Sequence, residues 1–235
     1  MASKEGAIQM RLSAILMSRV IALGGAGEAD PFGQVFLPSL LTALVERYQF
    51  QKFPTALGQL DLSAGVVLEG GYAEECGTIS KLTIFKDGWT MEARSQTSQT
   101  KAALLAIFQW LADAHNLTYN EHTIKRWLYV TSLFFYSDAD LDLLNPILLT
   151  ICKTMEEYTV GTGRPRIPFK TSRIAVDFDR ASLDFPQAPF VIERDKTMLF
   201  GEHRYFSESP MPSELHIALL EEVERGILQR KLTTH

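Results

Sequence analysis

A predicted β-hairpin followed directly by a helix is the feature that most constrains the fold of this chain. Residues 79–85 and 89–94 are rich in β-branched and aromatic side chains, and Lys86-Asp87-Gly88 between them is a turn signal typical of hairpins. After a polar run, residues 100–115 repeat apolar side chains at helical spacing, namely Leu104, Ile107, Phe108 and Leu111. The segment therefore predicts a strand, turn, strand and helix in that order.

Two predicted strands are apolar on both of their faces. In residues 79–85, strict alternation would place Ile79 with Thr83 on one face and Leu82 with Ile84 on the other, so both faces are expected to be partly covered. Residues 126–136 carry apolar side chains on both sides, Trp127, Tyr129, Leu133 and Phe135 alternating with Leu128, Val130 and Phe134. This pattern predicts a central position in the sheet for residues 126–136.

A second predicted helix, over residues 141–158, carries an apolar stripe. Its members recur at steps of three and four: Leu141, Leu144, Leu148, Ile151, Met155 and Tyr158. Ser137 to Asp140 supplies capping residues before it, and Asn145-Pro146 is expected to break or restart its first turn. The stripe spans two heptads, fewer than the three or four typical of a coiled coil, so we interpret it as facing the core.

The predicted fold class is α+β, with one or more antiparallel sheets built from two hairpin-plus-helix units and packed helices. The glycine- and proline-rich run 161–168 is the best candidate for an internal boundary. Beyond it we predict strands over 173–179, 190–193 and 198–200 and a helix over 212–228. The predicted organisation is an N-terminal segment with a glycine loop (1–30), a first αββαβα unit (31–160) and a second ββα unit (161–235), which could also continue the first as one domain.

The N-terminal part of the chain gives a weaker signal. The apolar stretch 8–23 is interrupted by Arg11, Ser18 and Arg19 and fits neither the helical nor the strand period, so its type stays open. The longest run of uncharged residues in this stretch is far too short to span a membrane. The run 24–31 is a predicted loop, and a helix is expected over 38–50.

Composition and charge narrow the class of partner and the compartment. The net charge of −5 gives no electrostatic reason to expect a nucleic acid as the main partner. The two cysteines, Cys76 and Cys152, form neither a disulfide framework nor a recognisable set of metal ligands, which favours the reducing cytoplasm. No membrane association is predicted.

One group of residues could hold a metal ion. Asp177 and Asp179 stand two apart in a predicted strand, which places their carboxylates on one face roughly 6 to 7 Å apart along the chain. Glu193 arrives from the next strand and Lys196 follows it. Oxygen ligands and a lysine suit Mg²⁺- or Mn²⁺-dependent hydrolysis of a phosphodiester or nucleotide, with Lys196 as the electrostatic helper. The alternative is an amphipathic strand whose acidic side faces water.

A second group could bind a small anion. Arg164 and Arg166 lie beside glycines in the run 161–168, and arginine binds phosphate or carboxylate groups with two parallel hydrogen bonds. A plain linker is the simpler interpretation of that run. The glycines at 24–27 match neither the dinucleotide-binding pattern nor the P-loop pattern.

The remaining reactive residues form no complete catalytic set. The five histidines show no metal-type spacing, Ser207 and Ser209 lack the nucleophile-elbow pattern, and Glu74 and Glu75 beside Cys76 would raise its pKa. The sequence therefore predicts no cofactor and leans against an enzyme.

The segment from Arg194 to Phe206 is dense in arginine and aromatic residues, a composition typical of contacts between proteins. The predicted contact residues are Arg194, Phe200, Arg204, Tyr205 and Phe206. Pairing of Arg194 or Arg204 with Glu202 or Glu193 across the hairpin would explain the same composition. Our leading hypothesis from sequence is a non-catalytic adaptor or assembly subunit that acts through protein contacts and self-associates, most simply as a homodimer. The metal-dependent hydrolase and the small-anion sensor are the alternatives.

Overall fold

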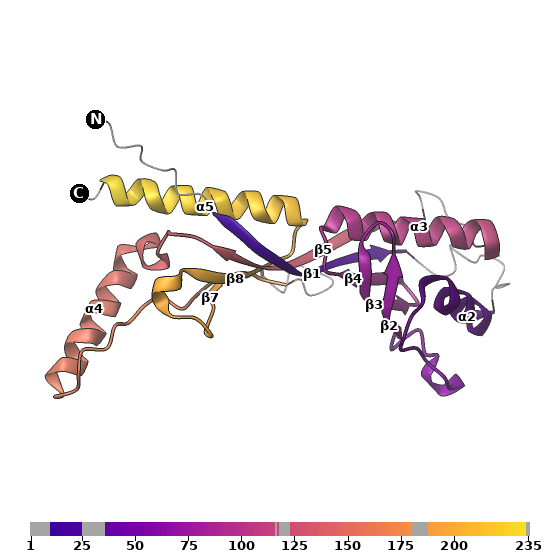
Figure 1. The fold of residues 1–235 in the computed structure, drawn as a ribbon, viewed down its shortest axis with the longest axis horizontal. Helices are drawn as coiled ribbons and strands as arrows, with labels where there is room; N and C mark the ends of the chain where they lie inside the picture. The colour runs from indigo at the N-terminus through magenta and orange to yellow at the C-terminus, as the bar shows by residue number, and fades with distance from the viewer. Residues whose placement is uncertain (1–9, 25–35, 116, 118–122, 180–187, 234–235) are drawn as a thin grey trace. The chain divides into compact units, whose positions relative to one another are not determined.

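The computed structural model of the chain describes residues 10–24, 36–115, 117, 123–179 and 188–233. Within these residues eight strands form an antiparallel sheet: β1 (Arg11–Leu23), β2 (Val66–Ala73), β3 (Gly77–Phe85), β4 (Gly88–Ala93), β5 (Arg126–Tyr136), β6 (Arg173–Val176), β7 (Phe190–Arg194) and β8 (Arg204–Ser209). Their order in the sheet is β2-β3-β4-β1-β5-β8-β7-β6. The helices are α2 (Leu37–Tyr48), α3 (Thr97–His115), α4 (Pro146–Gly161) and α5 (Ser213–Thr233), with 3₁₀ turns between elements (Figure 1). The predicted α+β class is confirmed.

The chain divides into two compact units. Unit 1 comprises Met1–Ala14, Leu133–Ser209 and Leu215–His235, and unit 2 comprises Ile15–Ser132 and Pro210–Glu214. The division falls inside β1 and inside β5, so each of these strands contributes to both units. The sequence instead placed a boundary between 160 and 161, where a breaker run follows α4.

The predicted hairpin forms β3 and β4 in unit 2, joined by the Lys86-Asp87 turn. Ile79 of β3 pairs with Ala93 of β4, and Lys81 pairs with Glu92. Since Ala93 and Glu92 are consecutive, β3 carries one extra residue at this point. Such a bulge reverses the side-chain alternation. Ile79 therefore joins Leu82 in the core, whereas strict alternation predicted opposite faces for the two.

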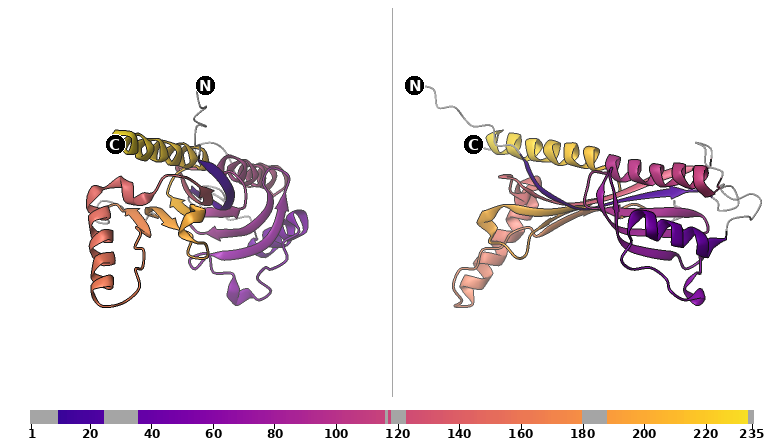
Figure 2. Two further views of the ribbon diagram at one scale, coloured as in Figure 1. Left: turned by 60° about the vertical axis from the view of Figure 1, so that its left-hand side comes forward. Right: turned by 45° about the vertical axis from the view of Figure 1, so that its right-hand side comes forward.

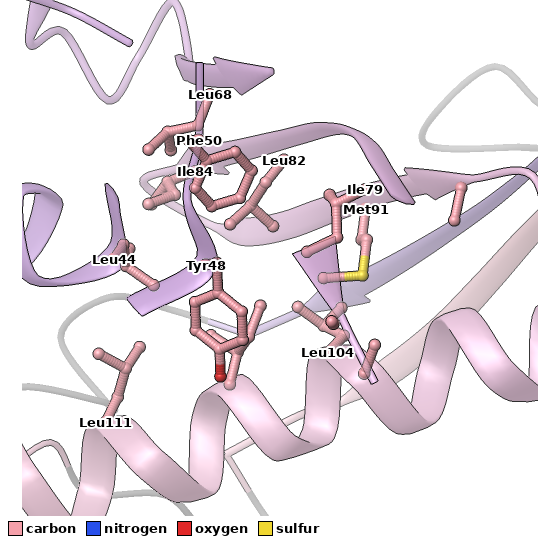
Figure 3. Packing of buried hydrophobic residues seen from close by; sticks show 14 of the residues in the cluster. Leu44, Tyr48, Phe50, Leu68, Ile79, Leu82, Ile84, Met91, Leu104 and Leu111 are labelled. Carbon is pink, nitrogen blue, oxygen red and sulfur yellow. The ribbon is translucent and has the colours of Figure 1, made fainter. Parts of the chain in front are cut away.

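Two helices cover one face of the unit 2 sheet and enclose its core. Leu44 and Tyr48 of α2 and Leu104 and Leu111 of α3 pack with apolar side chains of the sheet (Figure 3). The Tyr48 ring meets the Trp110 ring of α3 edge to face, with 5.8 Å between centroids. Both helices begin and end within three residues of the predicted positions.

The open question about residues 8–23 is resolved in favour of a strand, because β1 spans Arg11–Leu23. Gly24 follows β1 and donates its backbone N–H to the Asp87 carbonyl oxygen over 2.9 Å. The rest of the predicted loop 24–31 lies outside the described residues. In the described part of the chain, no helix is long and apolar enough to cross a bilayer.

Unit 1 contains a second, smaller core under α5. Leu133 and Phe135 of β5, Ile192 of β7 and Tyr205 of β8 pack against Leu220 of α5. Strands β7 and β6 match the predictions for 190–193 and for the start of 173–179. The predicted return strand at 198–200 is wrong, because residues 200–202 form a 3₁₀ turn and the returning strand is β8, which begins at Arg204.

The predicted helix over 141–158 is two elements. A 3₁₀ turn, η2 (Leu141–Leu144), begins after Asp140, whose carboxylate accepts a hydrogen bond from the Asp142 backbone N–H. Asn145 then caps α4 by accepting from the Ile147 backbone N–H over 3.0 Å, and Pro146 occupies the first helical position. The restart expected at Asn145-Pro146 is confirmed. Figures 1 and 2 show α4 with residues 162–172 running back beside it.

Candidate functional site

Helix α4 turns an apolar face to solvent. Ile147, Ile151, Met155 and Tyr158 are 65, 49, 44 and 74% exposed, and their spacing places them within an arc of about 80° on one side of the helix. We call these four residues the α4 face. A helix packed on a core normally buries such a stripe. The predicted core-facing role is therefore wrong for the second half of the stripe, whereas Leu141 at its start is buried in unit 1.

A neighbouring side of α4 holds the returning segment 162–169. Glu156 accepts two hydrogen bonds from the Arg166 guanidinium, over 3.0 and 3.2 Å, and one from the Phe169 backbone N–H over 3.2 Å. The Arg166 hydrogen bonds, and then the one from Phe169, lower the pKa of Glu156. These contacts occupy one side of the helix and leave the α4 face uncovered within the described residues.

A cluster of two acids and two bases lies where α4 and its returning segment join the rest of unit 1. Asp140 pairs with the Arg194 guanidinium and, over 2.6 Å, with the Lys170 ammonium, which also lies 3.2 Å from Asp142. The Thr171 backbone N–H donates to Asp142 and the Arg194 Nε–H donates to the Thr171 carbonyl oxygen. We call these four charged residues the anchor cluster.

The anchor cluster shifts the ionisation of its members. Burial alone would raise the pKa of Asp140, but the hydrogen bond from Lys170 and the charges of Arg194 and Lys170 outweigh burial and lower it. The hydrogen bond to Asp140 raises the pKa of Lys170 against the effect of burial. Two positive and two negative charges balance here, and Arg194 and Asp142 are almost wholly buried. The arrangement is that of a structural ion-pair network.

The residues predicted to bind a metal do not converge. Glu193 on β7 stands opposite Arg173, four residues before Asp177, which follows the end of β6. At about 3.3 Å per residue, this register separates the two acids by roughly 13 Å along the ribbon. Lys196 binds Glu193 over 2.6 Å. In the described part of the chain, no three His, Cys, Asp or Glu side chains are placed to hold a metal ion.

The two arginines predicted to bind an anion also take different positions. Arg166 is already bound to the carboxylate of Glu156. Arg164 is exposed in the turn after α4, and its backbone N–H donates to the Thr159 carbonyl oxygen over 3.3 Å. The guanidinium groups are therefore not presented together as one anion clamp.

The predicted contact residues are used mostly inside unit 1. Arg194 belongs to the anchor cluster, and buried Tyr205 donates its hydroxyl to the Ala139 carbonyl oxygen over 3.0 Å. Arg204 lies 4.2 Å from the centroid of the Phe134 ring and 3.2 Å from Asp195, while Phe206 meets the same ring edge to face. Phe200 alone of the five is exposed. The internal pairing considered from sequence does occur, but with Asp140 and Asp195 as the acids.

A buried histidine and serine lie together without access to solvent. Ser207 Oγ is 2.8 Å from Nε2 of His216 and donates to the Val191 carbonyl oxygen over 2.6 Å. Because the single hydroxyl proton is used on Val191, the imidazole Nε2–H must donate to Ser207, which leaves Nδ1 unprotonated. Both residues are wholly buried, so neither reaches a substrate. Burial lowers the pKa of His216 to about 4.

Two hollows lie among the described residues, one in each unit. One of about 10 Å³, room for about one water, lies in the unit 1 core beside Glu224, whose carboxylate accepts from Ser137 Oγ and from the Met10 backbone N–H. The other, of about 340 Å³, is an open hollow in unit 2 lined by residues that include Lys52 and Glu69. Those two side chains form an ion pair over 3.3 Å. Neither hollow gathers a nucleophile with a base.

The α4 face could be found only partly from sequence. The periodic stripe at 151, 155 and 158 was visible, but Ile147 was missed because it lies outside the three-four repeat that begins at Leu141. No local signal could pair Asp140 with Lys170 and Arg194, which are 30 and 54 residues away.

Comparison with protein-family models finds no match, and comparison with curated proteins finds none either. The function is therefore argued from the structure.

Proposed function

We propose that the protein is a non-catalytic assembly subunit that acts through protein contacts, with the α4 face as its contact surface. The observation that carries the proposal is the four-residue apolar stripe on an exposed helix. Apolar side chains at steps of three and four on a helix are the usual signature of burial against another surface. Here the described residues of unit 1 leave the α4 face exposed.

The way α4 is held supports the same role. The anchor cluster secures the base of the helix, and Glu156 ties the returning segment to one of its sides. A helix fixed in this way presents its exposed side chains without much loss of conformational freedom when a partner binds. Large uncovered apolar patches on proteins commonly mark interaction sites.

The proposal is tested by capture of the tagged full-length chain from cells that produce it naturally. Wild type is compared with Ile151→Lys on the α4 face and with Val160→Lys, which alters a residue of matching exposure (50 against 49%) on the opposite side of the same helix. We expect the associated chains to be retained by wild type and Val160→Lys and lost with Ile151→Lys. A wild-type chain that stays alone, or an Ile151→Lys chain that keeps every partner, would overturn the proposal.

A further inference from the structure

We infer that the occupant of the α4 face is a second copy of this chain, packed against it as an antiparallel helix pair. This inference rests on the proposed function and deepens it by naming the partner. It follows from three properties of the α4 face: its lack of charge, its size and its symmetry about the middle of the helix.

The α4 face carries no charge to match a charged partner. At 100° per residue, no acidic or basic residue of α4 lies within about 90° of the centre of the face. Lys153 and Glu157 point to other sides. Two copies of the face can therefore meet without like charges opposing each other, which would otherwise penalise contact between identical surfaces.

The area of the face suits a small symmetric interface. The exposed fractions of its four side chains leave roughly 400 Å² of mainly apolar surface per chain. Two such faces in contact bury up to about 800 Å² of total surface from these side chains, which is the size of a weak, transient interface. A contact of this size is expected to be reversible.

The positions of the side chains favour the antiparallel direction. Ile147 and Tyr158 are equally distant from the midpoint between residues 152 and 153, so a two-fold axis there places Ile147 level with Tyr158 of the second copy. The same axis places Ile151 beside Met155 of the second copy. Each small side chain then meets a larger one, whereas parallel pairing would set the two tyrosines against each other.

Electrostatics and sterics point the same way. The dipoles of adjacent antiparallel helices attract and those of parallel helices repel. In addition, each α4 is joined to the body of unit 1 at its N-terminal end. Antiparallel pairing keeps the two bodies at opposite ends of a helix about 24 Å long, whereas parallel pairing would bring them together.

The test is disulfide formation between single-cysteine positions on α4, in purified full-length chain that carries Cys152→Ser. Ile147→Cys and Tyr158→Cys are prepared separately and oxidised either alone or mixed. We expect cross-linked dimer only in the mixture, because position 147 of one copy lies beside position 158 of the other. A chain that carries both substitutions should cross-link to a second copy, because it cannot close a disulfide within one helix: the two positions are about 16 Å apart along it, and a disulfide needs Cα atoms within about 7 Å.

Each other outcome contradicts the inference. Cross-linking of either variant alone would show parallel pairing or random collision, and no cross-linking in any sample would show that the second copy does not occupy the face. If no sample cross-links but Ile151→Lys still abolishes capture of partners from cells, the partner is a different protein. The proposed function then stands and only the inference fails. If no sample cross-links and Ile151→Lys does not reduce capture from cells, both the inference and the proposed function fail.

Discussion

Acid should destabilise unit 1 through His216 in a way that a single substitution can isolate. The imidazole is wholly buried, its Nε2–H donates to Ser207, and Nδ1 has no hydrogen-bond partner among the described residues. Protonation at Nδ1 would therefore bury a positive charge together with an unsatisfied N–H. Burial accordingly lowers the pKa of His216 from 6.5 to about 4.

The sign and size follow from linkage. Between pH 6.5 and pH 4 the unfolded chain binds a proton at His216 that the folded chain does not, so the free energy of unfolding falls as the pH falls through this window. From pH 7 to pH 4.5 the loss attributable to His216 is about 2.5 kcal/mol. The carboxylates with lowered pKa, such as Asp140, also lose their stabilising charge in acid, but mainly below this window.

The comparison uses wild type and His216→Gln, which keeps a donor for Ser207 and cannot titrate. Stability of unit 1 is measured by hydrogen exchange of peptides from β8 and α5 in urea, because the three tryptophans all lie in unit 2 and do not report on unit 1. We expect the wild type to lose about 2.5 kcal/mol more than the variant from pH 7 to pH 4.5. Equal losses, or a His216 NMR resonance that titrates near its ordinary value, would refute the reasoning.

Three further predictions concern the anchor cluster, the returning segment and the buried thiol. Arg194→Met should lower the free energy of unfolding by about 3 kcal/mol in urea, because it removes the buried guanidinium that pairs with Asp140 and leaves Lys170 alone to offset two carboxylates; the exposed Lys196→Met should change it little, and equal effects would argue against a structural network. Glu156→Gln should speed hydrogen exchange at the Phe169 amide while leaving the unfolding midpoint of unit 1 in place, and unchanged exchange would show that this carboxylate does not hold the segment. Cys76, whose pKa is raised to about 11 by burial and then by Glu75, should resist a thiol reagent at pH 8 until urea unfolds the chain; rapid reaction of the folded protein would contradict its burial.

Local patterns predicted most elements of the fold. Residues 126–136 form a strand with the predicted bounds, and the Lys86-Asp87-Gly88 signal does join two strands. These features are set by side-chain alternation and turn chemistry within a few residues. The bulge at Ile79 to Lys81 has no glycine or proline to announce it, so the face on which Ile79 lies could not be predicted.

The segment between β7 and β8 shows a second feature that the sequence did not predict correctly. The return strand was predicted too early because residues 198–200 are apolar, but Leu199 and Phe200 are exposed in a turn. His203 takes a left-handed backbone conformation (φ 51°) that directs the chain into β8. Only a few per cent of residues other than glycine take that conformation, so a histidine is a weak sequence signal for it even though it is enriched there.

The candidate site illustrates the largest gap. Periodicity identifies an apolar side of α4, but it does not show whether the protein's own core or a partner covers that side. The deciding contacts are distant in sequence, since Asp140 meets Lys170 and Arg194 from two other segments. Those contacts hold the segments on either side of the helix, whose apolar side is exposed.

The mass of the purified chain in solution tests the central claim most directly. Light scattering over about 1 to about 300 µM should show wild type and Val160→Lys rising from the chain mass of 26.4 kDa towards twice that value, while Ile151→Lys stays at the chain mass throughout. A wild type that keeps the mass of one chain at every concentration, or an Ile151→Lys variant that associates as wild type does, would contradict pairing through the α4 face.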